Sequence, residues 1–389
     1  MRFKSVNSNS YLRTEKLFKV GFLGGGYDSA VGRAHKIAVE MDDLFEVVTG
    51  CFSLNNESNI KTATHYHIES ERTYLNIDNL IKSENSKIDA LVILTPTDQH
   101  KDQVIRAVSA GIPVICEKAL VASSEDALAV KNQLDKCSGF LAVTYNYTGY
   151  PMLRELKYII ETGRLGDVQQ INIEMPQEGF SRLDKTGKPI VPQNWRLKDE
   201  YVPTVSLDLG IHIHNVVSFL VRKRPLRVAS LSGSYGNYNQ ITDSINCIAE
   251  YEDGISANIW YGKTAIGYRN GLRVRVFGSK GGAEWLQTDP EILYFSDCFG
   301  NRYTVDRASP DIEIANMERY TRFKAGHPAG FVEAFANYYV DIADQLSNYL
   351  SGKKPSNSYV FGIDEALNGI VFLEAISDSV KTMDWVEVQ

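Results

Sequence analysis

The sequence lacks three features that would point directly to a class of function: paired cysteines, long apolar runs and long basic runs. The five cysteines among 389 residues are scattered without a C-x-x-C pair, which is typical of free thiols in a reducing cytoplasm. No run approaches the roughly 18 consecutive apolar residues of a membrane span, and residues 1–17 read as a polar extension without the apolar core of a secretion signal. A net charge of -7 without a long basic run argues against nucleic acid and anionic membrane surfaces. Small-molecule partners remain.

A glycine-rich turn near the start of the chain is the first positive signal. Residues 19–35 read as a buried strand, a turn at Gly24-Gly25-Gly26 and a helix. Glycines let the backbone approach a pyrophosphate, and a helix N-terminus offers N–H groups to it, so we expect a dinucleotide site. Ser29 stands where the usual fingerprint has its third glycine and Gly32 follows three residues later, which a longer loop before the helix would reconcile. The alternative is an ordinary strand-to-helix connection.

Strands and helices alternate through the first 145 residues. Strands are predicted at 45–51, 88–95, 112–116 and 140–144, which indicates a doubly wound parallel sheet and a dinucleotide-binding domain over 18–145. Ligands of such sheets bind at the carboxyl ends of the strands. The cofactor-contact candidates there, besides the glycines and Ser29, are Ser53, Thr95, Pro96, His100, Glu117, Lys118 and Asn146.

The second strand ends without the acidic residue that holds ribose hydroxyls in a classical NAD site, and no arginine follows at once to bind a 2′-phosphate. The choice between NAD and NADP therefore stays open. Lys118 follows the strand at 112–116, and its position alone fits a catalytic lysine and a solvated one equally well.

The second half of the chain, 146–389, has a different pattern. Residues 227–307 read as short alternating strands, the last individual one at 283–287, and with a Glu252-Asp253-Gly254 turn they indicate an open and largely antiparallel sheet within an α+β domain. Residues 176–203 form a long loop that carries Trp195 and Arg196, which are substrate-contact candidates. A last helix, about 364–380, is expected to pack back on the body.

One helix in this half combines an acid and a histidine. Asp208 and His212 are one turn apart and share a face. We expect His212 in the first turn, where the positive dipole end disfavours the imidazolium and keeps the ring available as a base. His212 and His214 point about 200° apart on a helix, and His65 and His67 have no acidic or thiol companions, so we predict no metal.

These motifs together resemble the Gfo/Idh/MocA family (glucose–fructose oxidoreductase, inositol dehydrogenase and rhizopine catabolism). The resemblance rests on Gly24-Gly25-Gly26, on Thr95-Pro96 with His100, on Glu117-Lys118-Ala119-Leu120, and on the pattern Asp208, Gly210, His212, Asn215. Ala119 replaces the family's usual proline, and Asn215 replaces its aspartate. The resemblance implies a Rossmann domain followed by the α+β domain, with Lys118, Asp208 and His212 as the catalytic group. It also implies that Tyr147 and His327 contact the substrate.

The function implied by the resemblance is NAD- or NADP-dependent hydride transfer at a hydroxyl or carbonyl carbon of a sugar, sugar derivative or cyclitol. A homodimer or homotetramer formed through the C-terminal sheet is also implied. Two alternatives stay open: a non-catalytic sugar and dinucleotide sensor, and an enzyme that retains its cofactor while two substrates exchange hydride.

Overall fold

The chain forms two compact units. The computed structural model describes residues 16–355 and 358–389, so residues 1–15 of the expected polar extension lie outside it. Among these described residues, the first unit comprises 16–150, 317–324, 329–355 and 358–367, and the second comprises 151–316, 325–328 and 368–389. Within the described residues, no helix is both long and apolar enough to cross a membrane.

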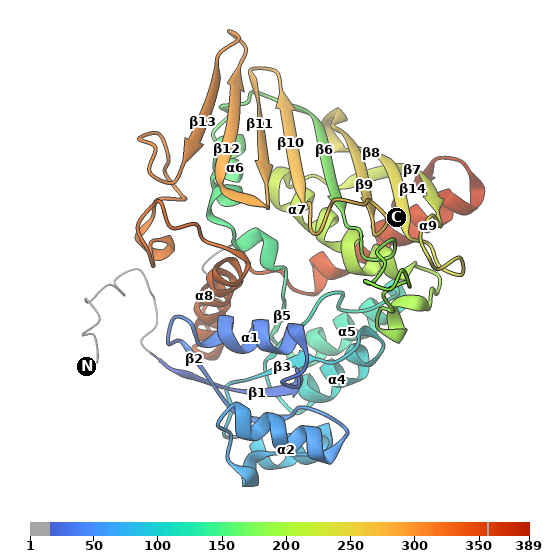
Figure 1. The fold of residues 1–389 in the computed structure, drawn as a ribbon. Coiled ribbons are helices and arrows are strands. Elements are labelled where there is room, and N and C mark those ends of the chain that lie inside the picture. Colours follow the sequence, from blue (N-terminus) through green and yellow to red (C-terminus); the bar gives the residue numbers. More distant parts are fainter. Residues whose placement is uncertain (1–15, 356–357) are drawn as a thin grey trace. The chain divides into compact units, whose positions relative to one another are not determined.

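The first unit contains the predicted parallel sheet (Figure 1). Its strand order is β2-β1-β3-β4-β5, and every neighbouring pair is parallel. The chain order reverses between β1 and β3, which is where ligands of doubly wound sheets bind. The strands are β1 (Phe18–Gly24), β2 (Phe45–Cys51), β3 (Ala90–Leu94), β4 (Val114–Cys116) and β5 (Leu141–Val143). The helices between them are α1 (Ala30–Glu40), α2 (Asn56–His65), α3 (Ile77–Glu84), α4 (Thr97–Ser109) and α5 (Ser124–Cys137).

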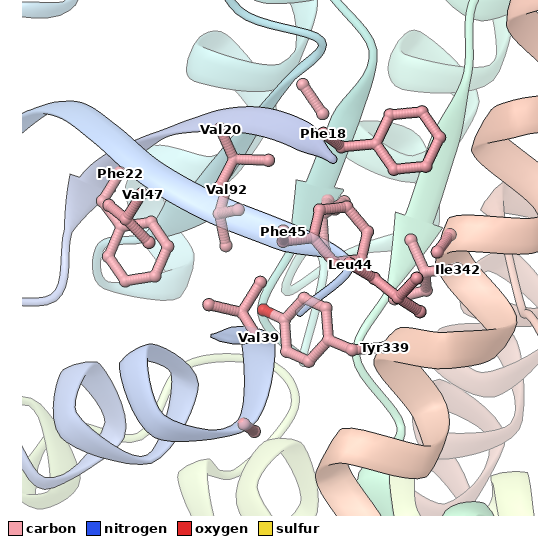
Figure 2. Packing of buried hydrophobic residues seen from close by; sticks show 14 of the residues in the cluster. Phe18, Val20, Phe22, Val39, Leu44, Phe45, Val47, Val92, Tyr339 and Ile342 are labelled. Carbon is pink, nitrogen blue, oxygen red and sulfur yellow. The ribbon is translucent and has the colours of Figure 1, made fainter. Parts of the chain in front are cut away.

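A helix from late in the chain completes the core of this unit. The aromatic stripe of α8 (Phe331–Leu350) packs against the amino-terminal strands, and the rings of Phe45 and Tyr339 lie 5.7 Å apart (Figure 2). We expected this helix within the 146–389 domain, but residues 329–367 group with the first unit. The reason is physical, because these aromatic side chains bury a face that α1 and the sheet leave apolar.

The second unit is built on a nine-stranded sheet, ordered β13-β12-β11-β10-β6-β9-β8-β7-β14. Only β6 and β9 pair in parallel, so the prediction of a largely antiparallel sheet is confirmed. The strands are β6 (Val168–Pro176), β7 (Pro225–Gly233), β8 (Ser244–Tyr251), β9 (Ser256–Gly262), β10 (Arg273–Gly278), β11 (Gly281–Leu286), β12 (Asp289–Asp297), β13 (Arg302–Asp306) and β14 (Val386–Glu387). The longer helices are α6 (Pro151–Glu161), α7 (Ile211–Val221) and α9 (Ile363–Thr382), whose first residues belong to the first unit.

Candidate active site

The glycine turn forms a tight cradle between β1 and α1. Gly24 and Gly25 have φ angles of +83° and +70°, which favour glycine. A Cβ on Gly32 would lie 2.3 Å from the carbonyl oxygen of Gly25, so Gly32 provides the close helix-to-turn contact of the third fingerprint glycine. Ser29 is instead the N-cap, and its Oγ accepts a hydrogen bond from the Gly32 amide at 3.2 Å. The sequence therefore reaches the usual geometry with a longer loop, as expected.

The end of β2 is fixed by an amide rather than by an acid. Asn59 Oδ1 accepts hydrogen bonds from the backbone N–H groups of Phe52 (2.7 Å) and Ser53 (3.3 Å). Near this end the ring of Tyr27 lies 4.6 Å from that of His65, which ends α2. His65 ends α2 and His67 lies in the turn that follows, so the two histidines do not share a strand face.

His100 joins the loops that follow β3 and β4. Its ring is buried, with Nε2 at 2.7 Å from the carbonyl oxygen of Thr95 and Nδ1 at 3.0 Å from that of Ala119. Burial lowers the pKa of this histidine. Both ring nitrogens face backbone carbonyls, so the residue holds the two loops together, and its predicted contact with the cofactor stays a prediction.

Glu117 stands in a hydrogen-bonded network that sequence reasoning missed. Thr144 Oγ1 donates to its carboxylate at 2.6 Å, and His35 Nε2 lies 3.0 Å from the same oxygen. The other ring nitrogen of His35 lies 2.6 Å from the hydroxyl of Tyr339 on α8. Burial opposes ionisation of Glu117, but the His35 hydrogen bond and the charges of His35 and Lys118 outweigh it, so its pKa is lowered.

Glu117 is followed in the chain by Lys118, the predicted catalytic lysine, and by Ala119. Lys118 is half-buried directly beyond β4, and the peptide bond between Lys118 and Ala119 is cis. Asn146 lies in the short helix Asn146–Gly149 after β5, and its buried Nδ2 has no hydrogen-bond partner among the described residues. Tyr147 is buried in the same helix and stacks on Tyr150 with ring centroids 6.3 Å apart.

In the second unit, Asp208 and His212 lie on a continuous helical segment. Helical geometry begins at Thr204, passes through a π-helix over Ser206–Gly210 and continues as α7. The prediction that His212 occupies the first turn is therefore wrong, because the helix begins after Pro203 and His212 lies about two turns inside it. Irregular π turns occur often at functional sites.

This helical segment is pinned against the sheet. A Cβ on Gly210 would lie 3.0 Å from the hydroxyl of Tyr261 and 2.9 Å from a Leu373 methyl group. That hydroxyl is also 2.8 Å from Ser206 Oγ. The position between Asp208 and His212 therefore requires glycine for packing. The contacts of Gly210 and Ser206 with Tyr261 set the distance of this helical segment from the sheet.

Two cations contact the carboxylate of Asp208. Lys263 Nζ lies 2.7 Å from Oδ2, and Arg196 Nη1 donates a hydrogen bond to the same oxygen. The Arg196 guanidinium also stacks 4.3 Å from the ring centre of Trp195, which is 42% exposed. Arg196, predicted as a substrate contact, thus binds Asp208, and Lys263 is a site residue that the sequence did not reveal.

His327 lies in the short exposed stretch before α8. Its carbonyl oxygen accepts a hydrogen bond from Arg307 at 3.2 Å, and its side chain is exposed. His214 lies on α7 among apolar groups, with its ring 5.2 Å from that of Phe372, and burial lowers its pKa to about 4. Among the described residues no three His, Cys, Asp or Glu side chains form a group suited to a metal ion. The prediction of a metal-free protein stays a prediction.

The predicted residues therefore form two groups. The glycines, Ser29, Ser53, Thr95, Pro96, His100, Glu117, Lys118, Asn146 and Tyr147 belong to the first unit. Trp195, Arg196, Asp208, His212 and His327 belong to the second. Their roles as catalytic, cofactor-binding and substrate-binding residues stay predictions.

Comparisons with known proteins agree along nearly the whole chain. Residues 18–145 match the oxidoreductase family with an NAD-binding Rossmann fold, and residues 153–284 match the GFO/IDH/MocA C-terminal domain. The uncharacterized oxidoreductase YfiI of Bacillus subtilis is 26% identical over 96% of this chain and 97% of its own. Inositol 2-dehydrogenase of Rhizobium meliloti is 26% identical over 64% of this chain and 70% of its own.

A solved structure shares the fold. The inositol dehydrogenase homolog of Azotobacter vinelandii, crystallised with NADH and myo-inositol, superposes with a TM-score of 0.87 at 23% identity. The match covers 98% of this chain and all of that one.

Proposed function

We propose that this chain, which belongs to the Gfo/Idh/MocA family of oxidoreductases, transfers a hydride between a nicotinamide cofactor and a hydroxyl-bearing carbon of a sugar, sugar derivative or cyclitol. The observation that carries the proposal is the placement of Lys118 at the carboxyl edge of the sheet that also carries the glycine cradle. In sheets of this kind that edge holds the dinucleotide.

The residues of the first unit fit a dinucleotide. The cradle at Gly24, Gly25 and Gly32 brings backbone within reach of a pyrophosphate at the start of α1, and added side chains would fill it. The buried amide nitrogen of Asn146 offers a further donor. When bound, the nicotinamide accepts or returns the hydride. Whether the 2′-position carries a phosphate is left to experiment, because the β2 end has neither the acid of an NAD site nor an adjacent arginine.

Three side chains would perform the chemistry on the substrate. His212 takes the proton of the reacting hydroxyl as the hydride leaves the same carbon. Lys118 stabilises the developing alkoxide through its charge and a hydrogen bond. Asp208 orients His212 or a substrate hydroxyl. Tyr147, Trp195 and His327 are proposed to contact the substrate beyond the reacting carbon.

The first test is nicotinamide absorbance at 340 nm with NAD and with NADP, across cyclitols, free sugars, sugar phosphates and nucleotide sugars. We expect one substrate class to give turnover and to identify the cofactor. A protein that binds dinucleotide by calorimetry but turns over nothing in the panel would contradict the proposal and favour a sensor. Nucleotide released on denaturing the purified protein would favour the retained-cofactor enzyme instead.

We also propose that two copies of the chain associate through the open face of the second unit's sheet. The strand registers place Leu231, Ile248 and Phe277 on this one face, where they are 69%, 50% and 40% exposed. A hollow of about 590 Å³ lies over the same strands. Two arginines of this face contact carboxylates, with Arg273 2.6 Å from Glu284 and Arg275 3.7 Å from Glu174, so the face suits a second identical surface better than an anionic ligand.

Light scattering tests this association. The Ile248→Lys variant should run as a smaller species, because a buried charge in the contact would be costly. The matched control is Ile60→Lys, an equally exposed isoleucine of α2 in the first unit. A monomeric wild type, or an unchanged mass for Ile248→Lys, would contradict the proposal.

A further inference from the structure

Lys263 follows β9 directly and its charge is buried. Its side chain is 8% exposed, and Nζ lies 2.7 Å from Asp208 Oδ2 and donates to Gln177 Oε1 at 3.0 Å. A buried ammonium is costly to desolvate, so it persists only where its partners hold it well.

The backbone of Lys263 is held by two other segments. Its N–H donates to the carbonyl oxygen of Asp243 at 2.8 Å, and its carbonyl oxygen accepts from the N–H of Phe180 at 2.8 Å. The side chain thus extends from a fixed point on the sheet. Arg196, by contrast, lies on the short helix Asn194–Leu197 within the loop that follows β6, and its side chain is 24% exposed.

Two cations on one oxygen of one carboxylate exceed what charge balance requires. One cation is enough to neutralise the single negative charge of Asp208. The second cation must also lose part of its hydration, and Asp208 has no second negative charge to offset that cost. The arrangement does fix the carboxylate plane, since both contacts converge on Oδ2 and so determine where Oδ1 points. Orientation of this kind is worth much in catalysis, where a displacement of about 1 Å can cost roughly 100-fold in rate.

We propose that Lys263 is a positioning residue that holds the carboxylate of Asp208, ionised and in one orientation, for the reaction. The proposal rests on the proposed function, because Asp208 is a member of the proposed catalytic group. Lys263 acts through Asp208 and touches neither substrate nor cofactor. Arg196 contacts the same carboxylate from the loop that follows β6.

The test is a double-mutant cycle on turnover. Lys263→Met should lower kcat by about 10- to 100-fold, with dinucleotide affinity by calorimetry unchanged within about 2-fold. In the Asp208→Asn background the same substitution should change kcat by less than about 3-fold, because the group it positions is already altered. A merely structural lysine would give no such dependence on Asp208.

A matched control is available in the same unit. Lys157 on α6 is also buried, and its Nζ donates to Glu161 and to the carbonyl oxygen of Phe219, both at 2.8 Å. Lys157→Met should lower thermal stability but leave the kcat of the folded protein unchanged. If Lys263→Met does not fold, Lys263→Gln carries the comparison, since it keeps a donor toward Asp208 without the charge.

The outcomes separate the two proposals. Unchanged turnover in Lys263→Met, or an equal loss with Asp208 and with Asn at that position, overturns the positioning role while the proposed chemistry stands. Wild-type turnover in Asp208→Asn removes Asp208 from the catalytic group and overturns the positioning role, while hydride transfer by the chain stands. If the wild type turns over nothing, the carbon-13 titration of the Asp208 carboxyl decides: it should shift to higher pH in Lys263→Met, and an unchanged titration overturns the inference.

Discussion

Lowering the pH from 7.5 to 5.0 should destabilise the second unit through His214. The ring is fully buried on α7 beside Phe372, and burial lowers its pKa from 6.5 to about 4. The folded protein therefore keeps His214 neutral at pH 5, whereas the unfolded chain binds a proton below pH 6.5. The sign follows directly: stability falls as the pH falls from about 6.5 to about 4.

The size of the effect comes from the two pKa values. The pKa of His214 differs by about 2.5 units between the unfolded and folded states. At about 1.36 kcal/mol per unit, the full loss of stability is about 3.4 kcal/mol, which is reached only below both pKa values. At pH 5.0 the unfolded state is almost fully protonated and the folded state hardly at all, which leaves a loss of about 2 kcal/mol relative to pH 7.5.

Urea unfolding of wild type and His214→Gln at both pH values measures this loss. The variant removes the titrating ring, so its stability should fall by about 2 kcal/mol less than that of the wild type over the same interval. Imidazole NMR gives a direct check. A His214 ring that titrates near 6.5 in the folded protein would refute the reasoning.

Three further predictions concern the proposed site. Gly32→Ala should abolish detectable dinucleotide binding by calorimetry and cost about 1–3 kcal/mol of stability, because its Cβ would lie 2.3 Å from the Gly25 carbonyl oxygen; retained affinity would contradict the cradle. Lys118→Ala should lower kcat by more than about 100-fold with little change in dinucleotide affinity, and equal losses of both would remove its catalytic role. His212→Asn should leave the melting temperature and dinucleotide affinity intact while suppressing hydride transfer by about 100-fold or more, so a high residual rate at neutral pH would assign proton transfer elsewhere.

The sequence was most informative where one local signal dominates. Strand β2 matches its predicted range of 45–51, since its aromatic and β-branched residues between a helix and a polar segment favour a strand. Ser123 and Asp126 have the spacing of a helix cap, and the Ser123 side chain does accept a hydrogen bond from the Asp126 amide at 3.2 Å at the start of α5. Strands β12 and β13 fall in the predicted strand region but received no individual ranges, because their side chains are mostly exposed or half-buried, without a clear apolar alternation.

Features that depend on distant partners were beyond sequence reasoning. The spacing of Asp208 and His212 predicted that they share a helix. It did not predict the π turn or the earlier start of the helix, where Gly210 packs against Tyr261. Lys263 could not be recognised from the sequence, because lysines often follow strands. Only the fold shows that its Nζ lies 2.7 Å from the carboxylate of Asp208, 55 residues earlier in the chain. The same holds for His35, which contacts Glu117 across 82 positions.

The position of α8 near the end of the chain has a consequence for folding during synthesis on the ribosome. The sheet of the first unit is encoded by residue 143, yet the side chains of α8 that cover its amino-terminal strands lie beyond Phe331. At about 5–20 residues per second, the ribosome needs roughly 10 to 40 s to add the intervening segment of about 190 residues. Throughout that interval the nascent sheet exposes an apolar face around Phe18 and Phe45, which is a binding site for chaperones and a hazard for truncated expression products.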